Sequence, residues 1–138
     1  MQRAGLAYYC DAAIGRGGHG SGIAVVVRDA AGEIVAATRR RLGPMTNNEA
    51  EYEALILGLE FALERGDPHQ RLTFLVDSQI VVGQVAGMFS VRSPNLVPRH
   101  RRVRELLARL PGATLVFVPR DRNRLADALA VEALTEDG

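Results

Sequence analysis

The chain has 138 residues, of which 47% are hydrophobic and 24% are charged, and its formal net charge is +1. This length suffices for one hydrophobic core, so we expect a single domain over residues 1–138. The apolar runs are far shorter than the roughly 20 residues that cross a bilayer, and the first residues lack the apolar segment of a signal peptide. We therefore expect no membrane span and no secretion, and the single cysteine, Cys10, fits the reducing cytoplasm.

The first third of the chain predicts three strands joined by short connections. An apolar run at residues 6–13 that contains one acid, Asp11, indicates a buried strand. Strand-like segments follow at 23–27 and at 34–42, separated by a turn at 29–32. Three consecutive strands with short connections predict an antiparallel meander.

The remaining two thirds predict helices that alternate with strands. Apolar residues at helical spacing, preceded by cap residues, indicate a helix from Thr46 to Gly66. The later predicted elements are a strand at 71–76, a helix that Asp77 and Ser78 can cap and that ends near residue 86, a loop at 87–98, a helix with apolar positions from Val103 to Leu110, a strand at 114–118 and a helix at 125–134. The order β-β-β-α-β-α-α-β-α predicts an α/β fold with a mixed five-stranded sheet and helices on both faces.

A glycine-rich segment follows the first predicted strand. Residues Gly15 to Gly20 satisfy the dinucleotide-binding pattern G-x-G-x-x-G. That pattern works when its last glycine opens a helix, whereas the residues that follow here have strand composition. We interpret the segment as a hairpin loop and expect no nucleotide cofactor.

Four acids occupy positions where a carboxylate is unexpected. Asp11 lies within a buried strand, where an unpaired charge is costly. Glu51 falls on the sheet-facing stripe of the first predicted helix, because Leu55 lies one helical turn after it. Asp127 is the one acid within an apolar stretch, and Asp77 ends a strand, where the commoner role of an aspartate is to cap the following helix.

These four acids support a function only if they converge. In a sheet of this kind the first strand is usually central and the fourth is its parallel neighbour, so Asp11 and Asp77 would lie side by side. Clustered carboxylates repel each other and are tolerated when divalent cations are bound. Oxygen ligands favour Mg²⁺ or Mn²⁺ over zinc. Two such ions about 3.5–4 Å apart catalyse phosphodiester hydrolysis in nucleases, which is therefore the predicted chemistry.

Four segments of the chain, taken together, resemble type 1 ribonuclease H, in particular its compact branch in archaea and many bacteria. They are Tyr9-Cys10-Asp11, Thr46-Asn47-Asn48-Glu49-Ala50-Glu51-Tyr52, Val76-Asp77-Ser78-Gln79 and Asn123-Arg124-Leu125-Ala126-Asp127-Ala128-Leu129-Ala130. The resemblance spans residues 8–134. It implies an endonuclease that cleaves the RNA strand of an RNA/DNA hybrid and leaves 5′-phosphate and 3′-hydroxyl ends, with two Mg²⁺ ions that Mn²⁺ can replace.

The resemblance also implies roles for the acids. Asp11 would bridge both metal ions, and Asp127 would share the ion that activates the attacking water. Glu51 and Asp77 would hold the ion on the leaving-group side. Arg120 stands where many bacterial members carry a mobile histidine, and it would bind phosphate or the leaving product because arginine cannot act as a base near neutral pH.

Five polar residues are expected to contact the hybrid. By resemblance, Thr46, Asn47, Asn48 and Gln79 line its minor groove, and we group Asn123 with them. Amide side chains both donate and accept hydrogen bonds, so they can contact a 2′-hydroxyl without demanding a base sequence. The alternative is that the first three only cap the helix, and we expect one of them to do so.

The departures from the family pattern leave other functions open. The basic insertion of larger members is absent, and the arginines between residues 87 and 109 form either a phosphate-binding face or a solvated helix face; they are Arg92, Arg99, Arg101, Arg102 and Arg104. The residues after Asp11, Ala12 and Ala13, also differ from the family pattern. One alternative function is a hybrid-binding module that has lost turnover, and another is a different nuclease of the same fold. We expect a monomer.

Overall fold

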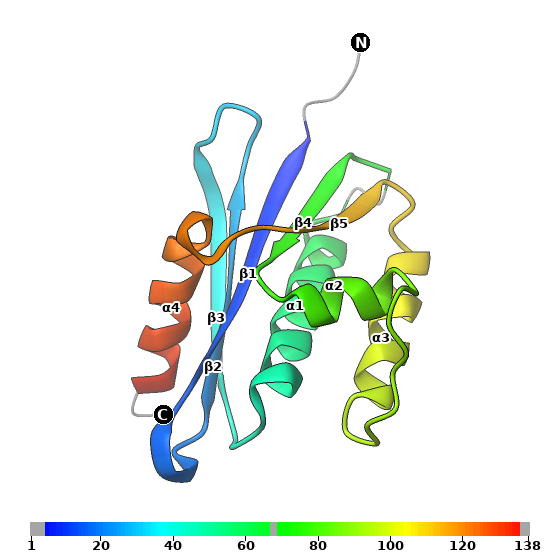
Figure 1. Ribbon diagram of the computed structural model, residues 1–138. Coiled ribbons are helices and arrows are strands. Elements are labelled where there is room, and N and C mark those ends of the chain that lie inside the picture. Colours follow the sequence, from blue (N-terminus) through cyan, green and yellow to red (C-terminus); the bar gives the residue numbers. More distant parts are fainter. Residues whose placement is uncertain (1–4, 67–68, 136–138) are drawn as a thin grey trace.

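The structure is a computed structural model that describes residues 5–66 and 69–135 (Figure 1). Its elements form a five-stranded sheet with helices packed against it. In chain order they are β1 (Leu6–Ile14), the 3-10 turn η1 (Arg16–Gly18), β2 (Ser21–Arg28), β3 (Ile34–Leu42), α1 (Asn47–Arg65), β4 (Leu72–Val76), α2 (Gln79–Val85), α3 (Val97–Ala108), β5 (Ala113–Phe117), the 3-10 turn η2 (Arg120–Arg122) and α4 (Arg124–Thr135). The predicted order of strands and helices is confirmed.

The sheet has the strand order β3-β2-β1-β4-β5, so the predicted central position of β1 is confirmed. β1 pairs antiparallel with β2 and parallel with β4, which makes the sheet mixed. In the parallel pair, Tyr9 lies opposite Leu75. Two residues further along each chain are Asp11 and Asp77, so this register brings these two acids to the same end of neighbouring strands.

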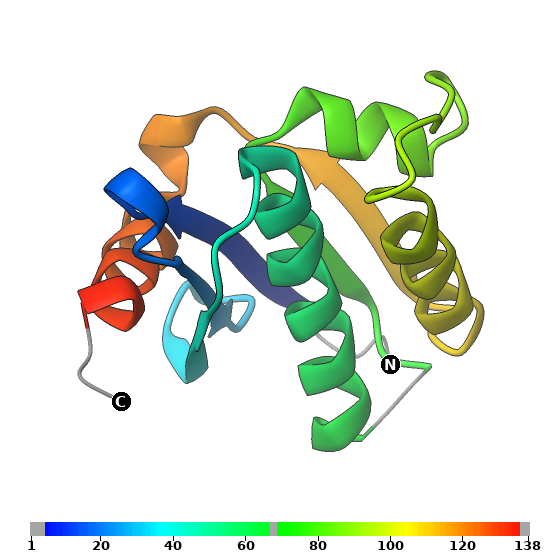
Figure 2. The same cartoon turned by 90° about the horizontal axis from the view of Figure 1, so that it is seen from below.

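Helices cover both faces of the sheet (Figure 2). α1 packs against β1, β2 and β4, whereas α4 packs against β1, β2 and β3. The main core lies between the sheet and α1, where Tyr8, Phe74 and Leu59 are fully buried. None of the helices in the described part of the chain is long and apolar enough to cross a bilayer.

Two glycines allow the helices to approach the sheet closely. A Cβ atom at Gly22 of β2 would collide with the carbonyl oxygen of Ala130 in α4. A Cβ atom at Gly58 of α1 would lie 2.6 Å from the Sγ atom of Cys10 in β1. At both points a helix touches the sheet where a glycine leaves room for it. These glycines therefore fix where α1 and α4 cross the strands.

Two elements begin more than one residue away from the start predicted from the sequence. α3 begins at Val97, so part of the loop predicted at 87–98 is helical. Pro98 lies in the first turn of this helix, where the missing N–H group costs no hydrogen bond. β2 begins at Ser21, because the glycine-rich loop ends sooner than its composition indicates. That loop contains η1 and connects β1 to β2, so the predicted hairpin is confirmed.

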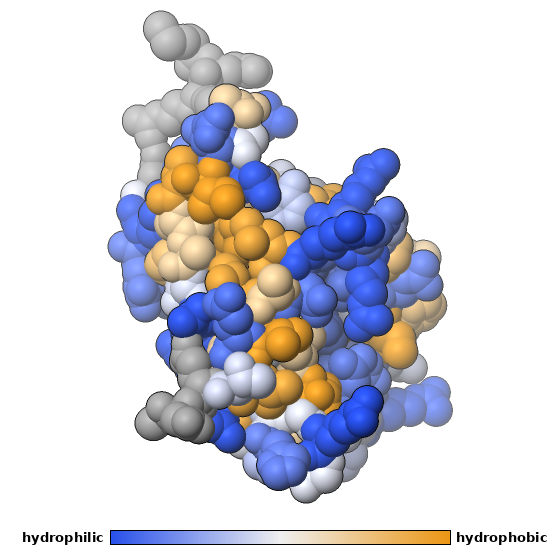
Figure 3. Space-filling view, turned by 90° about the vertical axis from the view of Figure 1, so that its left-hand side faces the viewer, coloured by the Kyte–Doolittle hydropathy of each residue, from blue (hydrophilic) through white to orange (hydrophobic). Residues whose placement is uncertain are grey.

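Apolar side chains form a strip down the side of the molecule that carries β3 and α4 (Figure 3). The exposed large hydrophobic side chains of these two elements are Ile34 and Val35 of β3 and Leu125 and Val131 of α4. β3 is an edge strand of the sheet. Its arginines, Arg39 to Arg41, place charge on this edge, which is a common protection of edge strands against pairing with other chains.

Candidate active site

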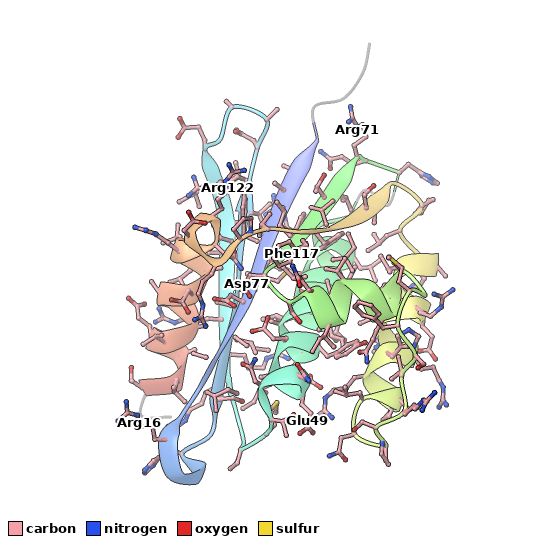
Figure 4. The ribbon with its side chains drawn as sticks, viewed as in Figure 1. Arg16, Glu49, Arg71, Asp77, Phe117 and Arg122 are labelled. Atoms are coloured by element: carbon pink, nitrogen blue, oxygen red, sulfur yellow. The ribbon has the colours of Figure 1, made fainter. Side chains whose placement is uncertain are left out.

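Three carboxylates converge at the centre of the molecule. Asp11 lies in β1, Glu51 in the first turns of α1 and Asp77 directly after β4. One oxygen atom from each lies within 4.8 Å of the others. The central region of Figure 4, where Asp77 is labelled, shows this meeting point of strand ends and helix. We call Asp11, Glu51 and Asp77 the acidic cluster.

The acidic cluster is poorly suited to carry its charges without a cation. Asp11 is 2% exposed and Glu51 is 5% exposed. Burial, followed by the charges of Glu51 and Asp77, raises the pKa of Asp11 above its ordinary value. Burial, followed by the charge of Asp77, likewise raises the pKa of Glu51. Within the described residues, one buried oxygen of each of the three acids has no hydrogen-bond partner, which fits a site for divalent cations.

Asp77 is not the cap of α2. Ser78 is the N-cap residue, and its hydroxyl oxygen accepts a hydrogen bond from the backbone N–H of Val81 at 3.2 Å. The capping role that is common for an aspartate at this position is therefore carried out by Ser78. This leaves the Asp77 carboxylate to the acidic cluster.

Asp127 lies near the acidic cluster but outside the group of oxygens within 4.8 Å. It is half-buried in the first turn of α4. Its charge adds to those that raise the pKa of Asp11, so it faces the same site from the α4 side. The structure thus brings three of the four predicted acids into contact distance and places the fourth beside them.

Asn123 occupies a position that the sequence analysis did not anticipate. It is 1% exposed, and its Nδ2 atom donates a hydrogen bond to the carbonyl oxygen of Cys10 at 2.9 Å. The backbone carbonyl oxygen of Asn123 accepts a hydrogen bond from the N–H of Asp127 at 3.0 Å. Asn123 therefore ties the strand at Asp11 to the start of α4, and its side chain is almost fully enclosed by the protein. Within the described residues its Oδ1 atom has no hydrogen-bond partner, so the side chain does not cap α4, and the contact with Cys10 could not be predicted from the local sequence.

A cleft of about 410 Å³ opens beside the acidic cluster. Its lining combines polar groups with two apolar side chains that the sequence analysis missed, Ile80 and Phe117. Phe117 is 40% exposed at the end of β5, close to Asp77 (Figure 4). The other lining residues are Asn47, Asn48, Glu51, Asp77, Ser78, Gln79 and Arg120. The positive charge of Arg120 lowers the pKa of Glu51, against the larger raising effects.

Thr46 is the N-cap residue of α1. Its side chain accepts a hydrogen bond from the N–H of Glu49 at 3.2 Å, and Glu49 accepts one in return from the N–H of Thr46 at 3.0 Å. The expectation that one of three residues caps this helix is confirmed. The side chains of Asn47 and Asn48 make no hydrogen bond within the described residues, and both line the cleft.

Two of the four arginines of α3 are paired with acids of α1. Arg99 donates to Glu53 at 2.7 Å and to Glu49 at 3.1 Å, and Arg102 donates to Glu60 at 3.2 Å. Their charges are therefore neutralised within the protein. Of the two interpretations left open from the sequence, a phosphate-binding face is not supported for these two residues.

Comparisons with known proteins agree with this arrangement. Residues 10–133 match the family described as "Reverse transcriptase-like". The chain is 41% identical over 105 residues to Ribonuclease HI of Halobacterium salinarum, an overlap that covers 76% of this chain and 52% of that protein. The chain thus spans about half the length of this relative.

Solved structures extend the similarity to the whole fold. RNase H1 from the halophilic archaeon Halobacterium salinarum superposes with a TM-score of 0.87 at 36% identity, covering 94% of this chain and 97% of that one. LC11-RNase H1 in complex with an RNA/DNA hybrid superposes with a TM-score of 0.86 at 31% identity, covering 94% and 96%.

Proposed function

This chain belongs to the type 1 ribonuclease H family, and on that premise we propose that it hydrolyses the RNA strand of RNA/DNA hybrids. The products would carry 5′-phosphate and 3′-hydroxyl ends. The observation that carries the proposal is the acidic cluster, in which three carboxylate oxygens lie within 4.8 Å of one another. A relative of the same fold, LC11-RNase H1, has been solved in complex with an RNA/DNA hybrid.

The acidic cluster fits a pair of Mg²⁺ ions, for which Mn²⁺ could substitute. Asp11, Glu51 and Asp77 each offer a buried oxygen without a hydrogen-bond partner among the described residues, and carboxylate oxygens are the ligands that these cations prefer. Asp127 would complete the set from the α4 side. When bound, such ions activate a water molecule and stabilise the charge that develops on the attacking and leaving oxygens.

The protein's own residues hold and orient the substrate around this cluster. Asp11, at the centre, would contact both ions, while Glu51 and Asp77 would face the leaving group. Arg120 lines the cleft, and its guanidinium can donate two parallel hydrogen bonds to a phosphate. Because arginine stays protonated, its role is to bind the phosphate or the departing product rather than to accept a proton.

The polar side chains of the cleft would let the protein recognise the RNA strand of a hybrid. Asn47, Asn48 and Gln79 line the cleft beside the acids. Their amides can donate to and accept from the 2′-hydroxyl that distinguishes RNA from DNA. Thr46 can still donate its hydroxyl hydrogen while its oxygen accepts from Glu49. Asn123 would act on the substrate indirectly, through the positions of Asp11 and Asp127.

A cleavage assay with a labelled hybrid tests this proposal. We expect RNA cleavage in the hybrid with Mg²⁺ or Mn²⁺, none with EDTA, and products whose 3′ ends a polymerase can extend. Single-stranded RNA and duplex DNA of the same sequence serve as control substrates. Asp11→Asn should slow turnover about a hundredfold to a thousandfold, because metal ions contribute several kcal/mol to such reactions.

A matched control separates loss of the site from loss of charge. Glu64→Gln removes one exposed carboxylate of α1 outside the cleft and should leave turnover unchanged. If the parent protein binds the hybrid but releases no product with either metal, the chain is a binding module. Cleavage of duplex DNA in preference to the hybrid would assign it to another class of nuclease.

A further inference from the structure

A second cavity, of about 250 Å³, lies next to the acidic cluster on the face of the sheet that α4 covers. It is lined by Tyr9 of β1, by Val26 and Arg28 of β2, and by residues 121–126, which end η2 and begin α4. Tyr9 precedes Asp11 by two residues and shares its face of β1, so the cavity lies about 7 Å from the cluster along the strand. We call this cavity the arginine pocket.

Positive charge dominates the lining of the arginine pocket. Arg28, Arg122 and Arg124 contribute guanidinium groups, and Asp121 is the one acid that lines it. Within the described part of the chain, none of these three arginines forms an ion pair with a carboxylate. In α3, by contrast, Arg99 is held by two glutamates. Within the described residues, the pocket therefore gathers three cationic side chains that no carboxylate neutralises.

The pocket is also held in shape by the residues around it. The guanidinium of Arg28 lies over the ring of Tyr9, 5.9 Å from its centre, and donates to the carbonyl of Gly32 at 2.8 Å. Asn123 fixes the adjoining backbone through the carbonyl of Cys10. These contacts anchor Arg28 at one side of the pocket, while Arg122 and Arg124 are exposed at the other.

The start of α4 adds to the attraction for an anion. Arg124, Leu125 and Ala126 form its first turn and line the pocket, so the positive end of a twelve-residue helix faces it. A water molecule takes up about 30 Å³ of liquid, so the volume admits a phosphate group with part of its hydration. Arginine forks and helix N-termini both bind phosphate groups, so the two features together suit a phosphate.

We propose that the arginine pocket binds a backbone phosphate of the strand that is cut, a few linkages from the scissile bond. This inference rests on the proposed function and adds a phosphate-binding subsite to it. Adjacent phosphates of one strand are spaced by about 3.4 Å along the helix axis. A pocket about 7 Å from the acids along β1 is therefore one to three linkages away. Binding there fixes the position of the strand relative to the acidic cluster.

A cleavage map of a modified hybrid tests the subsite. Each hybrid carries one uncharged methylphosphonate linkage in its RNA strand, and the cut positions are mapped with Mg²⁺. For the parent protein, we expect a gap in the map at a fixed distance from the modification, where the neutral linkage would occupy the arginine pocket. In Arg124→Gln and Arg28→Gln this gap should fill in, while gaps caused by other contacts persist.

Binding measurements supply a second readout and a control. In EDTA, Arg124→Gln and Arg122→Gln should each weaken hybrid binding about threefold to tenfold and lower the salt dependence by about one counterion. Arg71→Gln removes an exposed arginine far from the site (Figure 4) and should change neither the map nor the salt dependence. Thermal melting of each variant confirms that it is folded.

Three outcomes contradict the subsite. In the first, the gap persists in both Arg124→Gln and Arg28→Gln while the hybrid is still cut. In the second, the salt dependence of hybrid binding is the same in Arg124→Gln and Arg122→Gln as in the parent. In the third, inorganic phosphate raises the Tm of the parent but not of Arg124→Gln, while the cleavage maps of the two proteins remain identical. The last result would indicate a site for free phosphate instead of a strand phosphate. A parent protein that cuts no hybrid contradicts the proposed function itself, which the other outcomes leave intact.

Discussion

Two adjacent residues at the end of β4 have separate tasks. The Ser78 hydroxyl oxygen accepts a hydrogen bond from the N–H of Val81 and so caps α2, whereas Asp77 contributes its carboxylate to the acidic cluster. A cap supports the fold, but a carboxylate beside two others opposes it when no cation is bound. Substitution of Ser78 should therefore destabilise the metal-free protein, whereas substitution of Asp77 should not.

We expect Ser78→Ala to lower the free energy of unfolding by about 1 kcal/mol with or without Mg²⁺, because it removes a helix cap. Asp77→Asn should leave the metal-free protein equally stable or more stable, and should abolish the stabilisation that Mg²⁺ gives the parent. Urea unfolding with EDTA and with Mg²⁺ measures both effects. An equal loss of stability for both variants in EDTA would show that Asp77 is a structural residue.

The contact between α1 and α3 is an arrangement of ion pairs beside the cleft. Arg99 bridges Glu49 and Glu53 and also donates to the carbonyl of Asn95 at 2.7 Å. Glu49 is at the same time the partner of Thr46 in the cap of α1, and these hydrogen bonds together with Arg99 lower the pKa of Glu49. Arg99 therefore supports the end of α1 that carries Asn47 and Asn48.

We expect Arg99→Gln to lower the free energy of unfolding by about 1 kcal/mol, since its partners are partly screened by solvent. The salt dependence of hybrid binding should stay unchanged, because the charge of Arg99 is already neutralised by two glutamates. Arg101→Gln, an exposed arginine of the same helix, is the matched control for stability. A reduced salt dependence at unchanged stability would instead identify Arg99 as a phosphate contact.

Local patterns in the sequence predicted the elements and their order. Helical spacing and cap residues located α1, and β-prone runs located the strands, because these depend on neighbours close in the chain. The sequence pattern predicts the start of α3 too late, because a loop-like composition extends to Pro98, although proline is compatible with a first helical turn. The packing role of Gly22 is not visible in the sequence, because α4 meets it only in the folded protein.

The candidate site was predictable where a residue type is costly at its position. Asp11 and Glu51 are acids at buried positions, which is visible from the sequence, and their meeting with Asp77 followed from the expected strand order. The partners of Arg99 and the arginine pocket were not predictable. Ion pairs between helices and cavities depend on side chains that are brought together only by tertiary structure.

The acidic cluster depends on the fold of the whole molecule. β1, α1 and β4 each contribute one acid, and α4 brings Asp127 to the same place, so most of the fold must form before these charges meet. In the unfolded chain the same carboxylates are apart and solvated. Folding without cations therefore concentrates charge that the unfolded chain disperses, and this links stability to pH.

Burial and neighbouring acids raise the pKa of Asp11 to about 9, so the metal-free folded protein keeps a proton that the unfolded chain releases above about pH 4. A raised carboxyl pKa stabilises the fold at low pH and loses this effect as the pH rises. We therefore expect the free energy of unfolding in EDTA to fall between about pH 5 and pH 9. Asp11→Asn in EDTA, and the parent protein in saturating Mg²⁺, should show a flatter profile. Urea unfolding across this range measures the slope, and a metal-free parent whose profile coincides with that of Asp11→Asn would refute the repulsion within the cluster.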